Sequence, residues 1–92
     1  MINIPDQRAI IDHYGKNDQT RIAMEELGEL IQAINKAYRA DGYGQAKINL
    51  VEEIADVMIM LEQMKIIYQI SDGDIQWFVD NKCKRQLERM GK

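Results

Sequence analysis

The fold is decided by residues 25–61, EELGELIQAINKAYRADGYGQAKINLVEEIADVMIML. Two long runs without proline flank residues 41–44 (DGYG), and in neither run do β-branched residues alternate with polar ones. In the first run, apolar residues recur every three or four positions, which is the spacing of one helix face. The second run is apolar at most positions, as in a helix buried on several sides. Since the two glycines mark a turn, the stretch predicts an antiparallel helical hairpin.

The flanking segments add one helix on each side of this hairpin. Pro5 suits the first turn of a helix that ends at Gly15. Asn17 or Asp18 is expected to cap the second helix, and residues 71–74 (SDGD) resemble a capping box that begins the fourth. The expected helices are 5–14, 17 or 18 to 40, 45–69 and one after 71. The chain is therefore predicted to be a single all-α domain, residues 1–92, folded as a four-helix bundle.

Size and composition limit the classes of function. A 92-residue chain buries only about 60–65% of its unfolded surface, yet 46% of its residues are hydrophobic, which favours further burial between chains. A net charge of −3 argues against nucleic acid as a partner. No apolar stretch reaches the roughly 18–20 residues that span a bilayer, so no membrane is expected. The single cysteine, Cys83, cannot form an internal disulfide, and a cytoplasmic location is therefore expected.

Several carboxylates occupy positions where apolar residues are expected. Glu26 falls inside the apolar face of the second helix, and Glu29 lies on its edge. The polar residues of the third helix collect in one seam, made by Asn49, Glu52, Glu53, Asp56 and Gln63. An unpaired carboxylate in apolar surroundings costs several kcal/mol, so a cation is expected to compensate.

Two explanations of these carboxylates remain open. In the first, they form ion pairs or reach solvent at the edge of the bundle. In the second, they bind a divalent cation, because few lysines or arginines lie nearby and Lys36, Arg39 and Lys47 cluster at the turn end of the hairpin. Oxygen ligands suit Mg²⁺ or Mn²⁺. A di-iron site is not expected, because it requires Glu-x-x-His pairs and the single histidine, His13, lies on a different helix.

The pattern EELGEL at residues 25–30 followed by EIAD at residues 53–56 resembles the E-E-x-x-E … E-x-x-D signature of the MazG-like, all-α nucleoside triphosphate pyrophosphohydrolases. The resemblance implies Mg²⁺-dependent cleavage of NTPs or dNTPs between the α and β phosphates, giving a nucleoside monophosphate and pyrophosphate. It makes Glu26, Glu29, Glu53 and Asp56 the metal ligands and the catalytic residues. Glu25 matches the leading acid of the motif. The resemblance makes it a candidate either for supporting the ligands of the first metal or for binding a second metal.

Cationic residues on the fourth helix are a second feature that supports this interpretation. Lys82, Arg85 and Arg89 form one stripe, and the resemblance implies that Lys82 and Arg85 contact the triphosphate. The alternative is that these cations only complement the dipole at the helix C-terminus. Asn49 is a candidate for substrate binding or for holding a water, and an amide satisfied between helices is the alternative.

Two further expectations concern the class of protein and its assembly. A non-catalytic helical module that binds a metal or nucleotide, or that mediates oligomerisation, is the alternative to an enzyme. The resemblance implies a homodimer or homotetramer. Because the third helix is apolar on several sides, its subunit interface is expected to be distinct from the intrachain face, which carries Leu50, Ile54, Met58 and Leu61. The expected interface residues are Val57, Met60, Met64, Ile67 and Tyr68.

Overall fold

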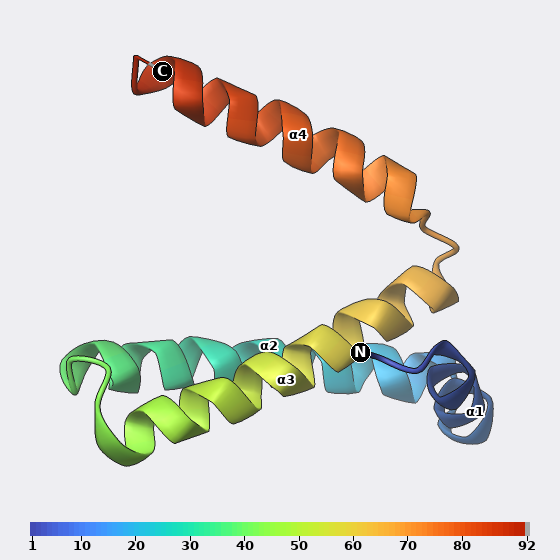
Figure 1. Cartoon of the computed structure of the whole chain (residues 1–92). Coiled ribbons are helices and arrows are strands. Elements are labelled where there is room, and N and C mark those ends of the chain that lie inside the picture. The colour runs from blue at the N-terminus through green and yellow to red at the C-terminus, as the bar shows by residue number, and fades with distance from the viewer. Residues whose placement is uncertain (92) are drawn as a thin grey trace.

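A computed structural model of the chain describes residues 1–91 and contains four α-helices, with no strand among these residues. They are α1 (Ile4–Tyr14), α2 (Lys16–Arg39), α3 (Gly44–Ile67) and α4 (Asp72–Arg89), shown in Figure 1. The all-α prediction is confirmed, and the expected ends of the helices differ from the observed ones by one or two residues. No helix within residues 1–91 combines the length and the apolar character needed to cross a membrane.

The junction between α1 and α2 is tighter than predicted. Gly15 adopts a φ of 93°, which glycine reaches without steric cost, and it serves as the last cap of α1 and the first cap of α2. The predicted cap at Asn17 or Asp18 is therefore wrong, because both residues already lie inside α2. The carboxylate of Asp18 pairs instead with Arg21, one turn further along the helix.

The hairpin of α2 and α3 is the centre of the fold. The two helices run antiparallel and side by side (Figure 1), joined by a turn in which Gly42 and Gly44 have positive φ values of 74° and 66°. Small side chains on α2, among them Ala33 and Ala37, are buried against α3 and allow the two backbones to approach closely. The predicted antiparallel hairpin is confirmed.

Three buried glutamines connect the three packed helices. Gln19 of α2 donates its Nε2 hydrogen to Gln63 Oε1 at 2.7 Å, and Gln63 of α3 donates in turn to Gln7 Oε1 of α1 at 2.8 Å. Gln63 is only 1% exposed. Since a buried amide is costly unless it is hydrogen-bonded, this chain of bonds fixes the register of α1, α2 and α3. The sequence analysis placed Gln63 with the acidic residues, whereas it belongs to this separate network.

The fourth helix does not join the other three. No residue of α4 is buried, and among the described residues no Cα atom of α4 lies within 8 Å of a Cα atom of another helix. Figure 1 shows α4 extending away from the hairpin. The radius of gyration is 16.1 Å, against about 12 Å expected for a compact domain of this length. Within one chain, the predicted four-helix bundle is therefore three packed helices and a detached fourth.

The junction between α3 and α4 is nevertheless ordered. Ser71 caps α4 by accepting a hydrogen bond from the backbone N–H of Asp74 at 3.0 Å, as predicted. Lys65 Nζ bridges Glu62 on its own helix at 2.9 Å and Asp72 at the start of α4 at 2.6 Å. These bonds hold the first turn of α4 in place beside the end of α3.

The predicted interface on α3 requires a correction. Val57 and Met60 are buried in the core of the chain itself, each only 6% exposed, so they are not available to another subunit. Ile54, Met58 and Leu61, which were assigned to the intrachain face, are exposed instead. A helix that is apolar nearly all round has no dominant face, and its spacing alone does not show which side meets α2.

Candidate metal centre

The hairpin brings together three of the four predicted metal ligands. Carboxylate oxygens of Glu26, Glu53 and Asp56 all lie within 4.8 Å of one another. Glu26 comes from the middle of α2, and the other two come from the middle of α3 and lie one helical turn apart. Because antiparallel pairing sets the middles of the two helices side by side, residues separated by 27 to 30 positions in the sequence meet at one place.

Burial and mutual repulsion raise the pKa values of two of these carboxyl groups, those of Glu26 and Glu53. The pKa of Glu26 is raised to about 7, first because burial disfavours the charged form and then because the carboxylates of Glu29, Asp56 and Glu53 repel it. The pKa of Glu53 is raised for the same reasons, burial first and then repulsion by Glu29 and Asp56. In a cluster of like charges that is partly removed from water, the last proton is hard to remove.

Two oxygen atoms of this cluster are buried without a partner. Glu26 Oε2 and Glu53 Oε2 are inaccessible to solvent and accept no hydrogen bond from any described residue. The ion pairs within residues 1–91 are Arg21 with Asp18 and Lys65 with Glu62 and Asp72, and none of them reaches the cluster. Since a buried anionic oxygen is costly when unpaired, the arrangement favours either a proton on these carboxyl groups or a cation, which the described part of the chain does not supply.

The donor set determines which cation fits. Three carboxylates supply only oxygen ligands, which suit hard cations such as Mg²⁺ and Mn²⁺ and are poor ligands for soft metals. Mg²⁺ commonly keeps several waters and is bound through one or two protein carboxylates, so this trio offers enough ligands. The residues present therefore fit the metal that the sequence suggested.

The remaining predicted residues lie around a small hollow beside the cluster. Glu29 is exposed and stands outside the trio, although it is near enough to raise the pKa values of Glu26 and Glu53. Glu29, Asn49 and Glu53 line a hollow of about 190 Å³. Asn49 accepts a hydrogen bond from Gln45 Nε2 at 2.9 Å, one turn earlier on α3, which leaves its own amide N–H groups free to serve a ligand. Glu25 is exposed and lies outside both the trio and the hollow.

Sequence reasoning missed one basic residue at this site. Lys36 lines the same hollow as Glu29 and Glu53, and it is the one lysine or arginine among the lining residues. The sequence does contain a signal for it, because Lys36 follows Glu29 by seven residues, which places both on one face of α2 two turns apart. It was assigned only to the turn end of the hairpin.

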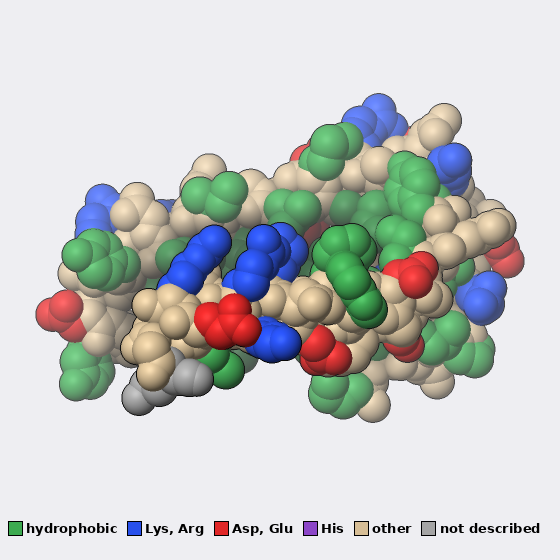
Figure 2. Space-filling view, turned by 90° about the horizontal axis from the view of Figure 1, so that it is seen from above, with side chains coloured by type: hydrophobic (Ala, Val, Ile, Leu, Met, Phe, Trp, Pro, Cys, Tyr) green, Lys and Arg blue, Asp and Glu red, His purple; other side chains and the backbone are tan. Residues whose placement is uncertain are grey.

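Lys82 and Arg85 are not brought to the carboxylates within one chain. They lie on α4, where they line a different hollow together with Trp77 and Phe78. Arg89 follows on the same exposed helix. Figure 2, seen from above, shows the Lys and Arg side chains gathered along α4 toward its C-terminal end. Their contact with substrate stays a prediction, because α4 stands apart from α2 and α3.

Comparisons with known proteins add little to this geometry. No family model matches the chain, and no solved structure matches it. A segment of the chain is 33% identical over 67 residues to a protein of Arabidopsis thaliana named probable mitochondrial-processing peptidase subunit beta. The match covers 68% of this chain but only 12% of the plant protein, so it concerns a short segment of a much longer sequence.

Proposed function

We propose that the protein is a Mg²⁺-dependent nucleoside triphosphate pyrophosphohydrolase of the MazG-like type. It would cleave NTPs or dNTPs between the α and β phosphates and release a nucleoside monophosphate and pyrophosphate. The observation that carries the proposal is the trio of Glu26, Glu53 and Asp56, in which two buried oxygens have no positive partner. The proposal also rests on the motif that surrounds these residues, because an acidic cluster alone does not identify a substrate.

Each residue of the site has a distinct task in this proposal. Glu26, Glu53 and Asp56 hold the cation, which when bound neutralises phosphate charge and orients the polyphosphate chain. Glu29, on the open side of the trio, faces the hollow where a nucleotide would approach. A carboxylate there that the cation does not neutralise can take the proton of the attacking water. Lys36 and Asn49 offer donors to phosphate oxygens at the same place.

The proposed working unit is a homodimer or homotetramer. The detached α4 and the large radius of gyration support it, because a small single chain seldom leaves a whole helix without packing. If the cationic stripe of Lys82 and Arg85 serves the substrate, it does so in an assembly whose geometry differs from that of one chain.

The test is a panel of NTPs and dNTPs with Mg²⁺ in which pyrophosphate and orthophosphate are assayed separately. Equal amounts of monophosphate and pyrophosphate are expected from at least one nucleotide. A diphosphate together with orthophosphate would show that the β–γ bond is cut and would refute the proposed reaction. Omitting Mg²⁺, or adding EDTA, should abolish the signal.

A second candidate is a non-catalytic module that binds the metal or a nucleotide. The position of the α4 cations favours it, because Lys82 and Arg85 do not face the carboxylates in one chain. The two candidates differ in a simple experiment: the regulator would be stabilised by Mg²⁺ and would turn over no nucleotide of the panel.

A further inference from the structure

One side of the hairpin carries a continuous set of exposed apolar residues. On α2, large apolar side chains recur at helical spacing and are all exposed: Met24, Leu27, Ile31, Ile34 and Tyr38. On α3, the corresponding exposed stripe is Val51, Ile54, Met58 and Leu61. On each helix, the exposed stripe lies beside the line of buried residues and is displaced from that line in the direction in which the helix winds. Because the two helices are antiparallel, the two stripes then lie on the same face of the hairpin. We name these nine residues the apolar face.

The apolar face lies opposite the side on which the metal centre opens. The hollow beside the carboxylates is lined by Glu29, Lys36 and Glu52, which lie on the other side of the buried lines of their helices. The hairpin therefore has one side for a polar ligand and one side that water solvates poorly. Exposed apolar patches of this extent are a mark of protein interfaces.

The detached helix has a matching stripe. Ile75, Val79, Cys83 and Leu87 fall on one side of α4 at a spacing of four residues, and the C-cap residue Met90 follows Leu87 by three. This side faces the hairpin, because Ile75 and Gln76 line a hollow of about 840 Å³ together with Met58 and Leu61 of the apolar face. The stripes on α2 and α4 cover 15 and 16 residues, so at a rise of about 1.5 Å per residue both are about 21–23 Å long.

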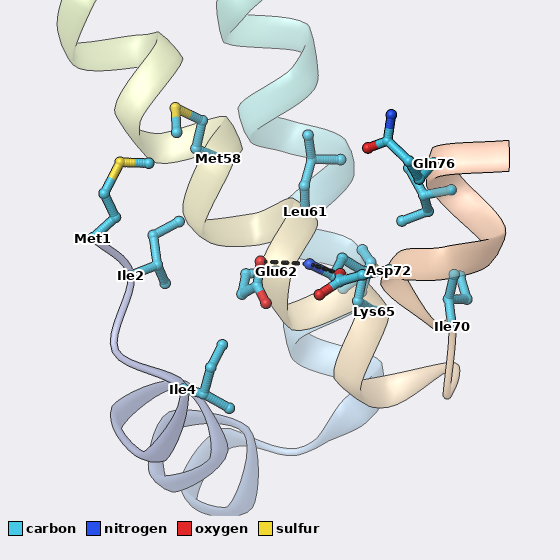
Figure 3. A pocket seen from close by; sticks show the side chains of 12 residues that line it. Met1, Ile2, Ile4, Met58, Leu61, Glu62, Lys65, Ile70, Asp72 and Gln76 are labelled. Carbon is cyan, nitrogen blue, oxygen red and sulfur yellow. Dashed lines mark hydrogen bonds and ion pairs between the residues drawn. The ribbon is translucent and has the colours of Figure 1, made fainter. Parts of the chain in front are cut away.

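The junction after α3 keeps α4 away from the apolar face of its own chain. Lys65 pairs with both Asp72 and Glu62 beside this hollow, as Figure 3 shows. Ile70 donates its backbone N–H to the carbonyl oxygen of Lys65 at 2.9 Å. Gln69 adopts a positive φ of 54° within this junction, which completes the change of chain direction. The space between α4 and the hairpin is thus set by ordered contacts, and both of its walls are apolar.

The exposed area indicates what fills that space. The chain exposes 7237 Å², whereas a compact monomer of 10.7 kDa exposes about 5,500 Å². The excess, about 1,700 Å², is within the roughly 1,000–2,500 Å² that each subunit of an obligate homodimer buries. A second copy of the same chain accounts for it without any other partner.

We propose that two copies of this chain exchange their α4 helices. The apolar stripe of each α4 packs on the apolar face of the other copy, and a twofold axis relates the two. The inference specifies the proposed oligomer and rests on it, but it does not depend on the proposed reaction. It also explains why α4 carries a well-formed cap and an apolar stripe yet buries nothing within its own chain.

Crosslinking through the native Cys83 tests the exchange. Ile31→Cys in a chain that also carries Cys83→Ser is refolded together with the wild-type chain and treated with a short bis-maleimide. A crosslinked peptide between position 31 of one chain and Cys83 of the other is expected, and it can only be formed between chains. Gln32→Cys in the same background is the matched control, since Gln32 lies on the opposite side of α2 and should give no link above the background.

The outcomes separate exchange from its alternatives. If the mixture gives no 31–83 link, whereas a single chain with both cysteines links internally, α4 folds back on its own hairpin and the proposal is overturned. A 31–83 link in the mixture together with a light-scattering mass of two or four chains supports it. A folded wild-type chain that scatters as a monomer would overturn both the exchange and the oligomer.

A charge placed on the apolar face gives a second test. Ile31→Lys is expected to convert the assembly to monomers at micromolar concentration, because Ile31 is 69% exposed in the single chain and buried only in the pair. Gln32→Lys should leave the mass unchanged. The nucleotide panel is run separately, so an exchanged dimer without turnover would refute the proposed reaction and leave the interface intact.

Discussion

The two sides of the α2–α3 hairpin are unfavourable for opposite reasons: one buries polar atoms, and the other exposes apolar side chains. On one side, Glu26 and Glu53 hold buried carboxyl oxygens that lack a partner. On the other, residues such as Ile31 and Met58 expose apolar surface that lacks a cover. Both sides are unfavourable in an isolated chain, and each defines by its chemistry what would relieve it: a cation on the first side and an apolar surface on the second. The same two helices therefore carry a candidate ligand site and a candidate interface, back to back.

The largest effect is expected from removing one carboxylate of the trio. Glu26→Gln should lower the rate of nucleotide hydrolysis by about 100-fold or more, because a metal ligand that neutralises phosphate charge contributes several kcal/mol to the transition state. Steady-state kinetics at saturating Mg²⁺ measures the change.

Glu25→Gln is the matched control for this change. Glu25 is the adjacent residue on the same helix, but it is exposed and lies outside the trio. Its substitution should cost far less activity. Equal losses in the two variants would show that the acids of α2 act through their total charge and not through the geometry of the trio.

A somewhat smaller effect is expected on stability when Mg²⁺ is added. Binding only to the folded state should stabilise the protein by about 2.7 kcal/mol at a metal concentration 100-fold above Kd. Thermal melts with and without Mg²⁺ measure it, and Glu53→Gln should remove the increment while leaving the metal-free protein at least as stable as before. If millimolar Mg²⁺ does not change the melting temperature of the wild-type protein, the proposed metal site is contradicted.

The metal-free protein should also become less stable as the pH rises from about 4.5 to 7. The folded-state pKa of Glu26, about 7, lies above its unfolded value of 4.5, so the folded state binds more protons in this window and the free energy of unfolding falls as pH increases. Denaturation at several pH values measures the slope.

Saturating Mg²⁺ provides the contrast for this pH dependence. A bound cation favours the ionised carboxylates, so the decline between pH 4.5 and 7 should vanish or reverse sign. A slope that is identical with and without Mg²⁺ would show that the metal does not bind at Glu26.

The smallest effect is expected at the cap of α4. Ser71→Ala removes the hydrogen bond to the backbone N–H of Asp74 and should cost about 1 kcal/mol of unfolding free energy, provided that α4 unfolds together with the rest of the assembly. Ser71→Asp keeps an acceptor at this position and should restore most of the loss. A Ser71→Ala variant that loses helicity without any shift of the denaturation midpoint would show that α4 is not docked on a partner.

The sequence by itself determined most of the local structure. Helical spacing, Pro5 and the glycine turns gave the four helices, since these signals depend on residues close together in the chain. The spacing also showed that Glu26, Glu53 and Asp56 fall on sides of their helices where apolar residues are expected. That conclusion needs only the geometry of each helix and the knowledge that the two helices pair.

What the sequence did not determine depends on contacts between distant residues. The buried side of α3 was assigned incorrectly, because Val57 and Ile54 are equally apolar and only the register with α2 decides which of them is covered. The same register separates Gln63 from the carboxylates and joins it to Gln7 and Gln19. The tertiary structure also decided that α4 stands away from its own hairpin, because this arrangement follows from the contacts of Lys65 at the α3–α4 junction and not from any periodic pattern.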